Sequence, residues 1–431
     1  MITDKYYNLS KYKLFSICRS ITGKGIRKTL KIIKNEFPKL KIVYVKSGTN
    51  VFDWKIPSEW NIKDAYVLDS NNNKIINFKK NNLHIVNYSI PINKVITKKE
   101  LLKHIHTNKK LPNAIPYVTS YYKKYWGFCC SDNQKKIIEK KNNQLSKFRV
   151  VIKSSLKKKG KLSYGEIVIP GKSRQEILVS TYICHPSMAN NELSGPIVSM
   201  SLINFFLKQK NLPKTLRFIF IPETIGSITF LYKNLTYLKK NLIGGYNLSC
   251  IGDNRMHSCM LTKYANALSD RSLIEAYKKL NIRPKIYSFL NRGSDERQYN
   301  SPGVDLPIAS IFRSKYHEYK EYHTSLDNFN LVTKKGVFGG YKVARCAIEL
   351  LSKKIIPKNK IICEPQLSKR NLYPHISIYK HKKNWSSKYL DFLQYSDGKN
   401  DLNDISKKIK LNKKDCLKIL KDLQKKKIID E

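Results

Sequence analysis

The chain has 431 residues and a formal net charge of +50, from 82 Lys and Arg against 32 Asp and Glu. Hydrophobic residues make up 41% of it, which is enough for a sizeable core and excludes a wholly disordered protein. No apolar run approaches the roughly 18 residues of a membrane span, and the start of the chain lacks an apolar signal core. We therefore expect a cytoplasmic protein of two or three domains, at about 150 residues per domain, with no membrane partner.

The positive charge is carried almost entirely by Lys spread along the whole chain. A dedicated phosphate-binding face more often clusters Arg, whose guanidinium grips phosphate with two donors. We therefore interpret the charge as compositional drift and expect no nucleic-acid partner. The nine Cys form no CxxC pair, which predicts reduced thiols.

The first third of the chain changes its pattern twice. Apolar spacing over residues 5–40 predicts helix. Short alternating segments between residues 45 and 110, broken by Gly, Asn, Asp and Pro, predict a small all-β unit. Residues 111–135 are rich in Pro and aromatic residues, which is typical of a connecting loop.

From about residue 148 onward, apolar strands alternate with helices. This rhythm predicts an α/β fold with a doubly wound, mostly parallel sheet covered by helices on both faces. The predicted strands are residues 176–184, 216–221, 243–252 and 306–312, and the predicted helices are residues 195–209, 227–240, 267–280 and 333–353. The predicted domains are an α/β core (1–44 and 111–354), an inserted β domain (45–110), a linker (355–386) and a winged-helix-like domain (387–431).

Two histidines and one glutamate follow predicted strands of the core. His185 comes directly after the strand 176–184, Glu223 follows the next strand, and His323 lies in the loop after the strand 306–312. Ligands of open α/β sheets bind beyond the carboxyl ends of the strands. Two imidazoles and a carboxylate from three strand ends fit a catalytic zinc site, which takes three protein ligands plus water. The prediction requires the two rings to lie within about 6 Å of each other.

Several short motifs occur in a characteristic order along the chain. They are CysArgSerIleThrGly (18–23), PheAspTrpLysIlePro (52–57), CysHisProSer (184–187), AsnGluLeuSerGly (191–195), GlySerAspGluArgGlnTyr (293–299) and TyrHisThrSer (322–325). With these motifs, the stretch of about residues 150–350 resembles the zinc aminopeptidase family that includes bacterial leucyl aminopeptidases and glutaminyl cyclases. Nearly the whole chain resembles bacterial aminopeptidase-like proteins found in surface-polysaccharide gene clusters.

The resemblance implies a doubly wound zinc aminopeptidase core with an inserted β domain and a C-terminal winged helix, but the metal ligands depart from the family pattern. Asn191 stands where the family has an Asp that bridges two zinc ions, and Glu192 follows it. Ser249 stands at a further Asp position, and the family's Glu-Glu pair is Pro222-Glu223 here. An amide is a neutral donor and cannot offset two dications as a carboxylate does. The metal-ligand candidates are His185, Asn191, Glu192, Glu223 and His323, and we expect one zinc ion rather than two.

Other residues of the same motifs are candidates for chemistry or substrate binding. Glu223 is a ligand or the general base, and Glu296 is the next candidate for the base or is simply a carboxylate at a helix start. Asp295 is expected to brace the substrate site through hydrogen bonds, whereas Arg297 binds a substrate carboxylate or pairs with its acidic neighbours. Cys184, at the end of a buried strand, is expected to be an inert thiol.

The last 45 residues combine a helix-turn-helix pattern with many Lys. Arg, Asn and Gln, which read base edges, are nearly absent from the helix that would enter the major groove. The pattern therefore favours a protein-contact module, with a homo-oligomer as one form of it, over a DNA-reading domain.

Three functions compete at this level. The first is a zinc-dependent aminopeptidase-like hydrolase that cleaves a terminal amide bond of a small peptide or an acylamino-sugar, a bond type implied by the resemblance. The second is a catalytically impaired relative that serves as a binding or scaffold protein, which Asn191 and Ser249 favour. The third is a basic nucleic-acid-binding protein that uses the C-terminal domain.

Overall fold

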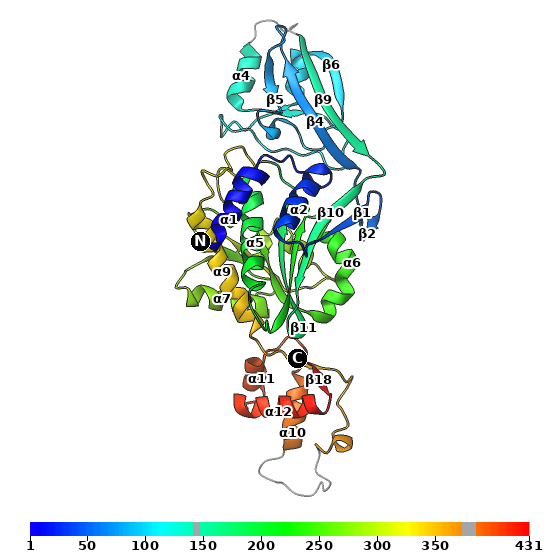
Figure 1. Cartoon of the computed structure of the whole chain (residues 1–431), viewed down its shortest axis with the longest axis vertical. Helices are drawn as coiled ribbons and strands as arrows, with labels where there is room; N and C mark the ends of the chain where they lie inside the picture. Colours follow the sequence, from blue (N-terminus) through cyan, green and yellow to red (C-terminus); the bar gives the residue numbers. More distant parts are fainter. Residues whose placement is uncertain (141–146, 373–384, 431) are drawn as a thin grey trace.

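The computed structural model describes residues 1–140, 147–372 and 385–430. Three units follow one another along the longest axis of the molecule (Figure 1). The small β unit lies at one end, the α/β core in the middle, and the C-terminal helices at the other end. In the described ranges, no helix is both long and apolar enough to cross a bilayer.

The core is built on one eight-stranded sheet. Its strands are β1 (Lys41–Lys46), β10 (Lys161–Ile169), β11 (Ser173–Tyr182), β12 (Lys214–Ile221), β13 (Leu242–Leu248), β14 (Ser258–Met260), β15 (Lys285–Tyr287) and β16 (Ile308–Phe312). They lie in the order β1-β10-β12-β11-β13-β16-β14-β15. The central strands β12, β11, β13 and β16 pair in parallel, and β10 and β14 join them antiparallel. The mostly parallel α/β sheet expected from the sequence is confirmed.

Helices cover both faces of this sheet (Figure 1). One layer contains α1 (Ile2–Leu9), α5 (Ser194–Phe206), α7 (Leu268–Lys279) and α9 (Lys334–Ser352), and the other contains α2 (Lys24–Glu36) and α6 (Ile225–Asn241). Because helices pack on both sides, the central strands are apolar on both faces, and all five residues of β16 are buried. A short helix, α8 (Glu296–Tyr299), precedes β16.

The start of α5 lies close against the sheet, and this contact positions the loop that precedes it. A Cβ on Gly195 would come within 2.3 Å of the carbonyl oxygen of Leu248 and within 2.2 Å of the Thr181 hydroxyl. Only glycine allows this approach. The π-helical turn Ala189–Leu193 therefore lies directly over the carboxyl ends of β11 and β13.

The small β unit is a four-stranded antiparallel sheet in the order β5-β4-β9-β6. Its strands are β4 (Glu59–Leu68), β5 (Lys74–Asn77), β6 (Ile92–Thr97) and β9 (Lys147–Lys157), and the minor elements near it are β7 (Ile105–His106), β8 (Phe128–Cys129), α3 (Lys98–Lys103) and α4 (Asp132–Lys140). The short hairpin of β2 (Asn50–Val51) and β3 (Trp54–Lys55) packs against α6 of the core. The sequence prediction assigned residues 147–157 to the core, because this strand runs almost directly into the core strand β10. We propose that the inserted unit extends from residue 59 to residue 157. Residues 141–146, which the prediction also assigned to the core, lie outside the described residues.

One carboxylate joins the inserted unit to the core. Glu59, at the start of β4, accepts hydrogen bonds from both terminal nitrogens of Arg27 in α2, at 2.9 and 2.7 Å. It also accepts from the backbone of Lys161 at 3.0 Å and from the side chain of Asn61 at 3.0 Å. Burial alone would raise the pKa of Glu59, but the hydrogen bonds from Arg27 and Asn61 outweigh it and lower this pKa to about 2.

The C-terminal unit has a small core of its own. It contains α10 (Trp385–Gln394), α11 (Leu402–Lys408), α12 (Lys413–Lys425) and the two-stranded pair β17 (Lys358–Asn359) and β18 (Ile429–Asp430). The predicted linker 355–386 contains β17, and its residues 373–384 lie outside the described residues. Arg271 of α7 holds Asp404 at 3.0 and 2.6 Å, and Lys354 holds Asp401 at 3.0 Å, so ion pairs attach this unit to the core.

Candidate active site

The structure brings together the predicted histidines and Glu223 at the carboxyl ends of the parallel strands. His185 follows β11, Glu223 follows β12, and His323 lies in the loop between β16 and α9. The ring centroids of His185 and His323 are 5.3 Å apart. This separation lies within the limit of about 6 Å set by two zinc–nitrogen bonds. His185 Nε2 lies 3.5 Å from Glu223 Oε2, so the His185 ring lies next to both other side chains.

A buried ion pair orients His185. Its Nδ1 lies 2.9 Å from Glu192 Oε2, and because a carboxylate only accepts, Nδ1 carries the proton and Nε2 faces Glu223. The other oxygen of Glu192 accepts from Arg19 Nε at 3.2 Å. The same Arg19 nitrogen donates to the backbone oxygen of His185 at 2.9 Å. Glu192 therefore fixes the ring orientation of His185, as carboxylates do behind the histidines of metal sites.

Cys184, His185 and Glu192 form a group whose ligand atoms lie within 4.8 Å of one another. This group is a poor place for a cation, because the guanidinium of Arg19 already neutralises Glu192. Burial raises the pKa of Cys184 to about 11, so its thiol stays protonated. Burial disfavours the charged form of His185, but the Glu192 carboxylate at 2.9 Å favours it, and the pKa of His185 is raised well above its ordinary value. A metal is therefore better placed on the Nε2 side, and binding it displaces a proton.

His323 is held in place by its neighbours but has an unpartnered nitrogen. Its backbone is left-handed, with φ of 54°, and its ring stacks on Tyr322 at a centroid distance of 3.9 Å. Nε2 is buried and has no hydrogen-bond partner in the described part of the chain. Burial and the charge of His185 lower the pKa of His323 well below its ordinary value, so the ring is neutral and can donate a lone pair. A buried nitrogen without a partner is costly unless a ligand takes it.

Asn191 contributes a second unpartnered donor atom. Its side-chain nitrogen donates to the hydroxyl of Tyr182 at 2.9 Å, and its Oδ1 is buried without a partner among the described residues. Asp327 holds the turn in place, since its carboxylate accepts from three consecutive backbone N–H groups, of residues 189 to 191, and from the Tyr319 hydroxyl. Ser249 Oγ is also buried without a partner in these ranges. Neutral oxygen atoms thus stand where the family resemblance implies carboxylates.

The remaining acidic candidates are held by protein donors. Glu223 Oε1 accepts from the Ser294 hydroxyl at 2.5 Å, and burial raises the pKa of this carboxyl although His185 and Ser294 act against it. Glu296 Oε1 accepts from the Tyr316 hydroxyl at 2.6 Å and from two backbone N–H groups, of residues 293 and 294, at 2.9 Å. Asp295 Oδ1 accepts from the backbone of Thr224 and from a serine hydroxyl. Burial and the charge of Glu223 raise the pKa of Asp295 to about 7.

Arg297 pairs with neither of its acidic neighbours. Its Nη2 donates to the Thr224 hydroxyl at 2.7 Å, and the residue is exposed. Thr224 has the unusual backbone angles φ 62° and ψ −76°, and it follows Glu223 directly. The pairing of Arg297 with Asp295 or Glu296, one of the two alternatives left by the sequence, is absent from the described residues.

The inserted unit supplies a wall of the site that the sequence analysis missed. The ring of Tyr117 packs edge-on against both histidines, 5.3 Å from His185 and 5.2 Å from His323. Its backbone N–H donates to the backbone oxygen of His323 at 2.8 Å, and its hydroxyl lies 2.8 Å from that of Tyr121. The run of Pro and aromatic residues was the available signal, but it was interpreted as a connecting loop. Arg19 was also missed as a site residue, although it lies inside one of the quoted motifs.

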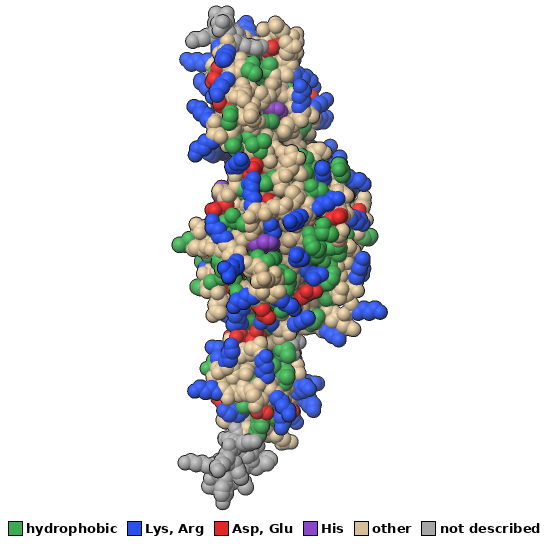
Figure 2. All heavy atoms as spheres, turned by 90° about the vertical axis from the view of Figure 1, so that its left-hand side faces the viewer, with side chains coloured by type: hydrophobic (Ala, Val, Ile, Leu, Met, Phe, Trp, Pro, Cys, Tyr) green, Lys and Arg blue, Asp and Glu red, His purple; other side chains and the backbone are tan. Residues whose placement is uncertain are grey.

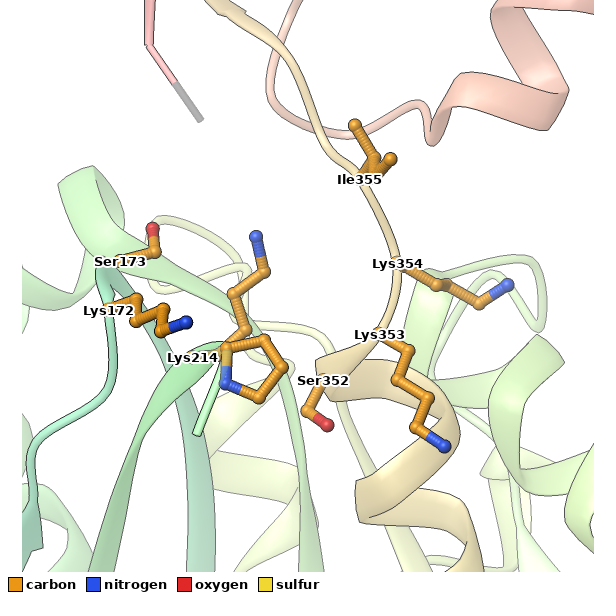
Figure 3. Close-up of a pocket in the computed structure, with 8 residues that line it drawn as sticks. Lys172, Ser173, Lys214, Ser352, Lys353, Lys354 and Ile355 are labelled. Atoms are coloured by element: carbon orange, nitrogen blue, oxygen red, sulfur yellow. The ribbon is translucent and has the colours of Figure 1, made fainter. Parts of the chain in front are cut away.

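A separate hollow of about 400 Å³ lies at the opposite edge of the sheet. It is lined by Lys172 and Ser173 at the start of β11, by Lys214 at the start of β12, and by residues 352–355 at and after the end of α9 (Figure 3). In Figure 3 the side chains of Lys353 and Lys354 point away from the hollow. None of the residues that line this hollow belongs to the histidine site, so the two are distinct.

Lysines and arginines are scattered over all three units on the face in Figure 2, without gathering on one of them.

Comparisons with known proteins agree with the fold. The family described as "Domain of unknown function (DUF4910)" matches residues 7–354, and a winged helix-turn-helix family matches residues 355–431. A Clostridium acetobutylicum protein, provisionally described as a polysaccharide biosynthesis protein with an aminopeptidase-like domain, is 43% identical over 412 residues, covering 93% of this chain and 90% of that protein.

Solved structures give the same picture. A crystal structure of a provisionally described peptidase from Clostridium acetobutylicum matches with a TM-score of 0.78 and 39% identity, covering 99% of this chain and 96% of that one. A zinc aminopeptidase from Bacillus subtilis has the same core fold, with a TM-score of 0.57 at 13% identity, covering 80% of this chain and 93% of that one. The chain therefore belongs to the DUF4910 family, has a zinc-aminopeptidase-like core and a C-terminal winged helix, and is a homologue of an aminopeptidase-like polysaccharide biosynthesis protein.

Proposed function

We propose that this protein is a zinc-dependent hydrolase that cleaves a terminal amide bond of a peptide or an acylamino-sugar. One observation carries the proposal: His185 Nε2 faces Glu223 Oε2 at 3.5 Å, beside the unpartnered Nε2 of His323. Two imidazoles and one carboxylate are a donor set of catalytic zinc sites. The amide bond type is suggested by the aminopeptidase-like description of the relative.

The residues fit one metal ion better than two. His185, His323 and Glu223 would hold it, and the unpartnered Oδ1 of Asn191 offers one neutral oxygen more. A second ion would need carboxylates where Asn191 and Ser249 stand, and their neutral oxygens offset little charge. A bound zinc ion polarises an acyl oxygen and lowers the pKa of coordinated water to about 7.

The chain's own residues prepare the site. Arg19 and Glu192 fix the ring of His185, and Ser294 orients Glu223. Tyr117 covers both imidazoles on the side of the inserted unit and limits access of bulk water. Glu296 already accepts hydrogen bonds from Tyr316 and from two backbone N–H groups. It therefore positions the loop that contains Ser294 and does not act as the general base.

Glu223 fills one of two roles, ligand or proton acceptor, and Glu223→Gln separates them. If Glu223 is a ligand, the variant loses zinc. If Glu223 accepts the proton of the attacking water, the variant keeps zinc and its kcat falls by about 10²- to 10⁴-fold. Zinc content by mass spectrometry and the hydrolysis rate of an aminoacyl p-nitroanilide and an N-acyl amino-sugar give the two readouts.

The proposal as a whole is tested with His323→Ala, with His106→Ala as control. His106 belongs to the inserted unit and bonds Tyr125, away from the site. We expect wild type and the control to retain about one zinc per chain and His323→Ala to lose zinc and hydrolysis together. Zinc binding that His323→Ala leaves unchanged would contradict the proposed site.

A second candidate is a binding or scaffold protein that keeps the metal without catalysis. The observation that favours it is the engagement of Glu296, which leaves Glu223 to serve as both ligand and base. Stoichiometric zinc with no turnover of either amide substrate would support this function over the hydrolase.

A further inference from the structure

The acidic groups around the histidines are poorly placed to receive a cationic substrate. Glu192 is paired with Arg19 and His185, Glu296 accepts from a tyrosine hydroxyl and two backbone N–H groups, and Asp327 accepts from four donors. Asp295 has one unpartnered oxygen, but the residue is fully buried. Among these carboxylates, only Glu223 is partly exposed, at 23%, and it faces His185. A free peptide N-terminus would therefore find no exposed carboxylate of this group beyond Glu223.

An exposed cation instead binds the residue that follows Glu223. Arg297 donates one hydrogen bond, to the hydroxyl of Thr224 at 2.7 Å, and has no ion-pair partner in the described ranges. A guanidinium has five N–H donors, so most of them remain available to a ligand. Its charge acts on Glu223, which places it within electrostatic reach of the reacting centre.

The backbone next to Arg297 is held in a strained form. Thr224 adopts φ 62° and ψ −76°, which is unfavourable for a β-branched residue, and its N–H is fixed by Asp295 Oδ1 at 2.8 Å. Such strain persists only where the surroundings enforce it, and it concentrates at ligand-binding sites. The conformation presents the Thr224 hydroxyl to Arg297 directly after Glu223.

We infer that the site takes an acyl-amide substrate bearing an anionic group, a carboxylate or a phosphate, which Arg297 and Thr224 bind, and does not select a peptide with a free N-terminal ammonium. Planar guanidinium donors match both anions with paired hydrogen bonds. The net charge of +50 adds a positive field that attracts anionic and repels cationic substrates. This inference rests on the proposed hydrolase and names its substrate class.

The test compares four probes that differ in charge. They are N-acetylglutamate (carboxylate), N-acetylglucosamine 6-phosphate (phosphate), N-acetylglucosamine (neutral) and leucine p-nitroanilide (cationic). We expect kcat/KM of the zinc-loaded full chain to be at least tenfold higher for one or both anionic probes than for the other two. The better of the two anionic probes identifies the anion. A preference for the neutral or cationic probe would overturn the inference and leave the hydrolase standing.

Variants locate the effect at Arg297. Arg297→Gln is expected to raise KM for the anionic probe about tenfold more than KM for the neutral probe, and Arg297→Lys is expected to restore part of the loss. Arg292→Gln, an exposed arginine in the neighbouring turn that touches only Phe289 among the described residues, is the control. Equal effects of Arg297→Gln on charged and neutral probes would overturn the inference.

A binding measurement keeps the inference testable without turnover. If no probe is hydrolysed, the proposed function fails, and calorimetric titration of the same four compounds still decides the charge preference. Tighter binding of an anionic probe that Arg297→Gln weakens about tenfold supports the anion site, and equal or tighter binding of the cationic probe refutes it.

Discussion

The two edges of the parallel sheet differ in burial and in chemistry. At the carboxyl edge, His185, Glu192 and Arg19 are buried and bonded to one another. At the amino edge, lysines surround an open hollow, and the C-terminal unit is attached by ion pairs such as Arg271–Asp404, whose side chains are 35% and 19% exposed. Buried charges are costly unless their partners are complete, whereas exposed pairs contribute little. The carboxyl edge is therefore the part of the fold where single changes have large effects.

The largest effect is expected from Arg19→Met. This change leaves the buried carboxylate of Glu192 without its main positive partner, so we expect a loss of about 3–5 kcal/mol in the free energy of unfolding. Urea denaturation measures it, with Arg271→Met as the matched control at the other edge. The double variant Arg19→Met/Glu192→Gln is expected to lose less than the two single variants together. If the losses of the two single variants simply added up in the double variant, Arg19 and Glu192 would not be energetically coupled.

Zinc is expected to stabilise the protein only through the histidine site at the carboxyl edge of the sheet. A ligand that binds only the folded state raises the free energy of unfolding by about 2.7 kcal/mol when its concentration is 100 times its Kd. We therefore expect zinc to raise the Tm of wild type and of the amino-edge variant Lys353→Gln, but not that of His323→Ala. Thermal unfolding with zinc and with a chelator measures this. A similar rise in His323→Ala would place the metal elsewhere.

The contacts of Glu59 that join the inserted unit to the core are expected to stabilise the protein in a pH-dependent way. Glu59→Gln removes charge from the hydrogen bonds with Arg27, which we expect to cost about 2 kcal/mol at pH 7. The folded pKa of about 2 lies below the unfolded value of about 4.3, so this stabilisation is present above pH 4.3 and is lost as pH falls toward 2.

Urea titrations at pH 7 and pH 3 check this prediction, since the difference between wild type and Glu59→Gln must shrink at the lower pH. Glu100→Gln, at a partly exposed carboxylate of α3, is the control and should change little at either pH. If Glu59→Gln lost the same free energy of unfolding at both pH values, the charge of Glu59 would not be what joins the inserted unit to the core.

The smallest effect is expected at the attachment of the C-terminal unit. Arg271→Met removes a partly exposed pair with Asp404, so we expect at most about 1 kcal/mol of lost stability and no change in zinc content. Chemical denaturation and metal analysis of the same sample measure both. A loss of zinc in this variant would mean that the two edges are coupled through α7.

The sequence predicted the core better than the inserted unit. Apolar strands alternating with helices identified the parallel sheet, because β16, the last seven residues of β11 and most of β12 are buried and mainly apolar. The extent of the inserted sheet was missed, because β9 pairs with β4 across 81 to 98 residues of chain and continues toward β10. Strand pairing over such separations leaves no local signal in the sequence.

The sequence likewise predicted some residues of the candidate site and missed others. Three strand ends and the order of motifs were sufficient to name His185, Glu223 and His323, since parallel strands present their carboxyl ends at one edge of the sheet. Glu192 was expected to be a metal-ligand candidate, but in the structure it lies between Arg19 and His185. No spacing rule connects Arg19 or Tyr117 to residues more than 60 positions away, so their contacts with the histidine site were not predicted.

The sequence by itself determined the fold class, the family and the identity of the two histidines, because apolar periodicity and short motifs are local properties of the chain. Tertiary structure decided which carboxylates are engaged and which cation remains exposed. Glu296 accepts bonds from residues on three segments, whereas Arg297, the next residue, keeps most of its donors available. The physical reason is that desolvation and hydrogen-bond saturation depend on which distant segments pack against a side chain, and neighbours in sequence do not share them.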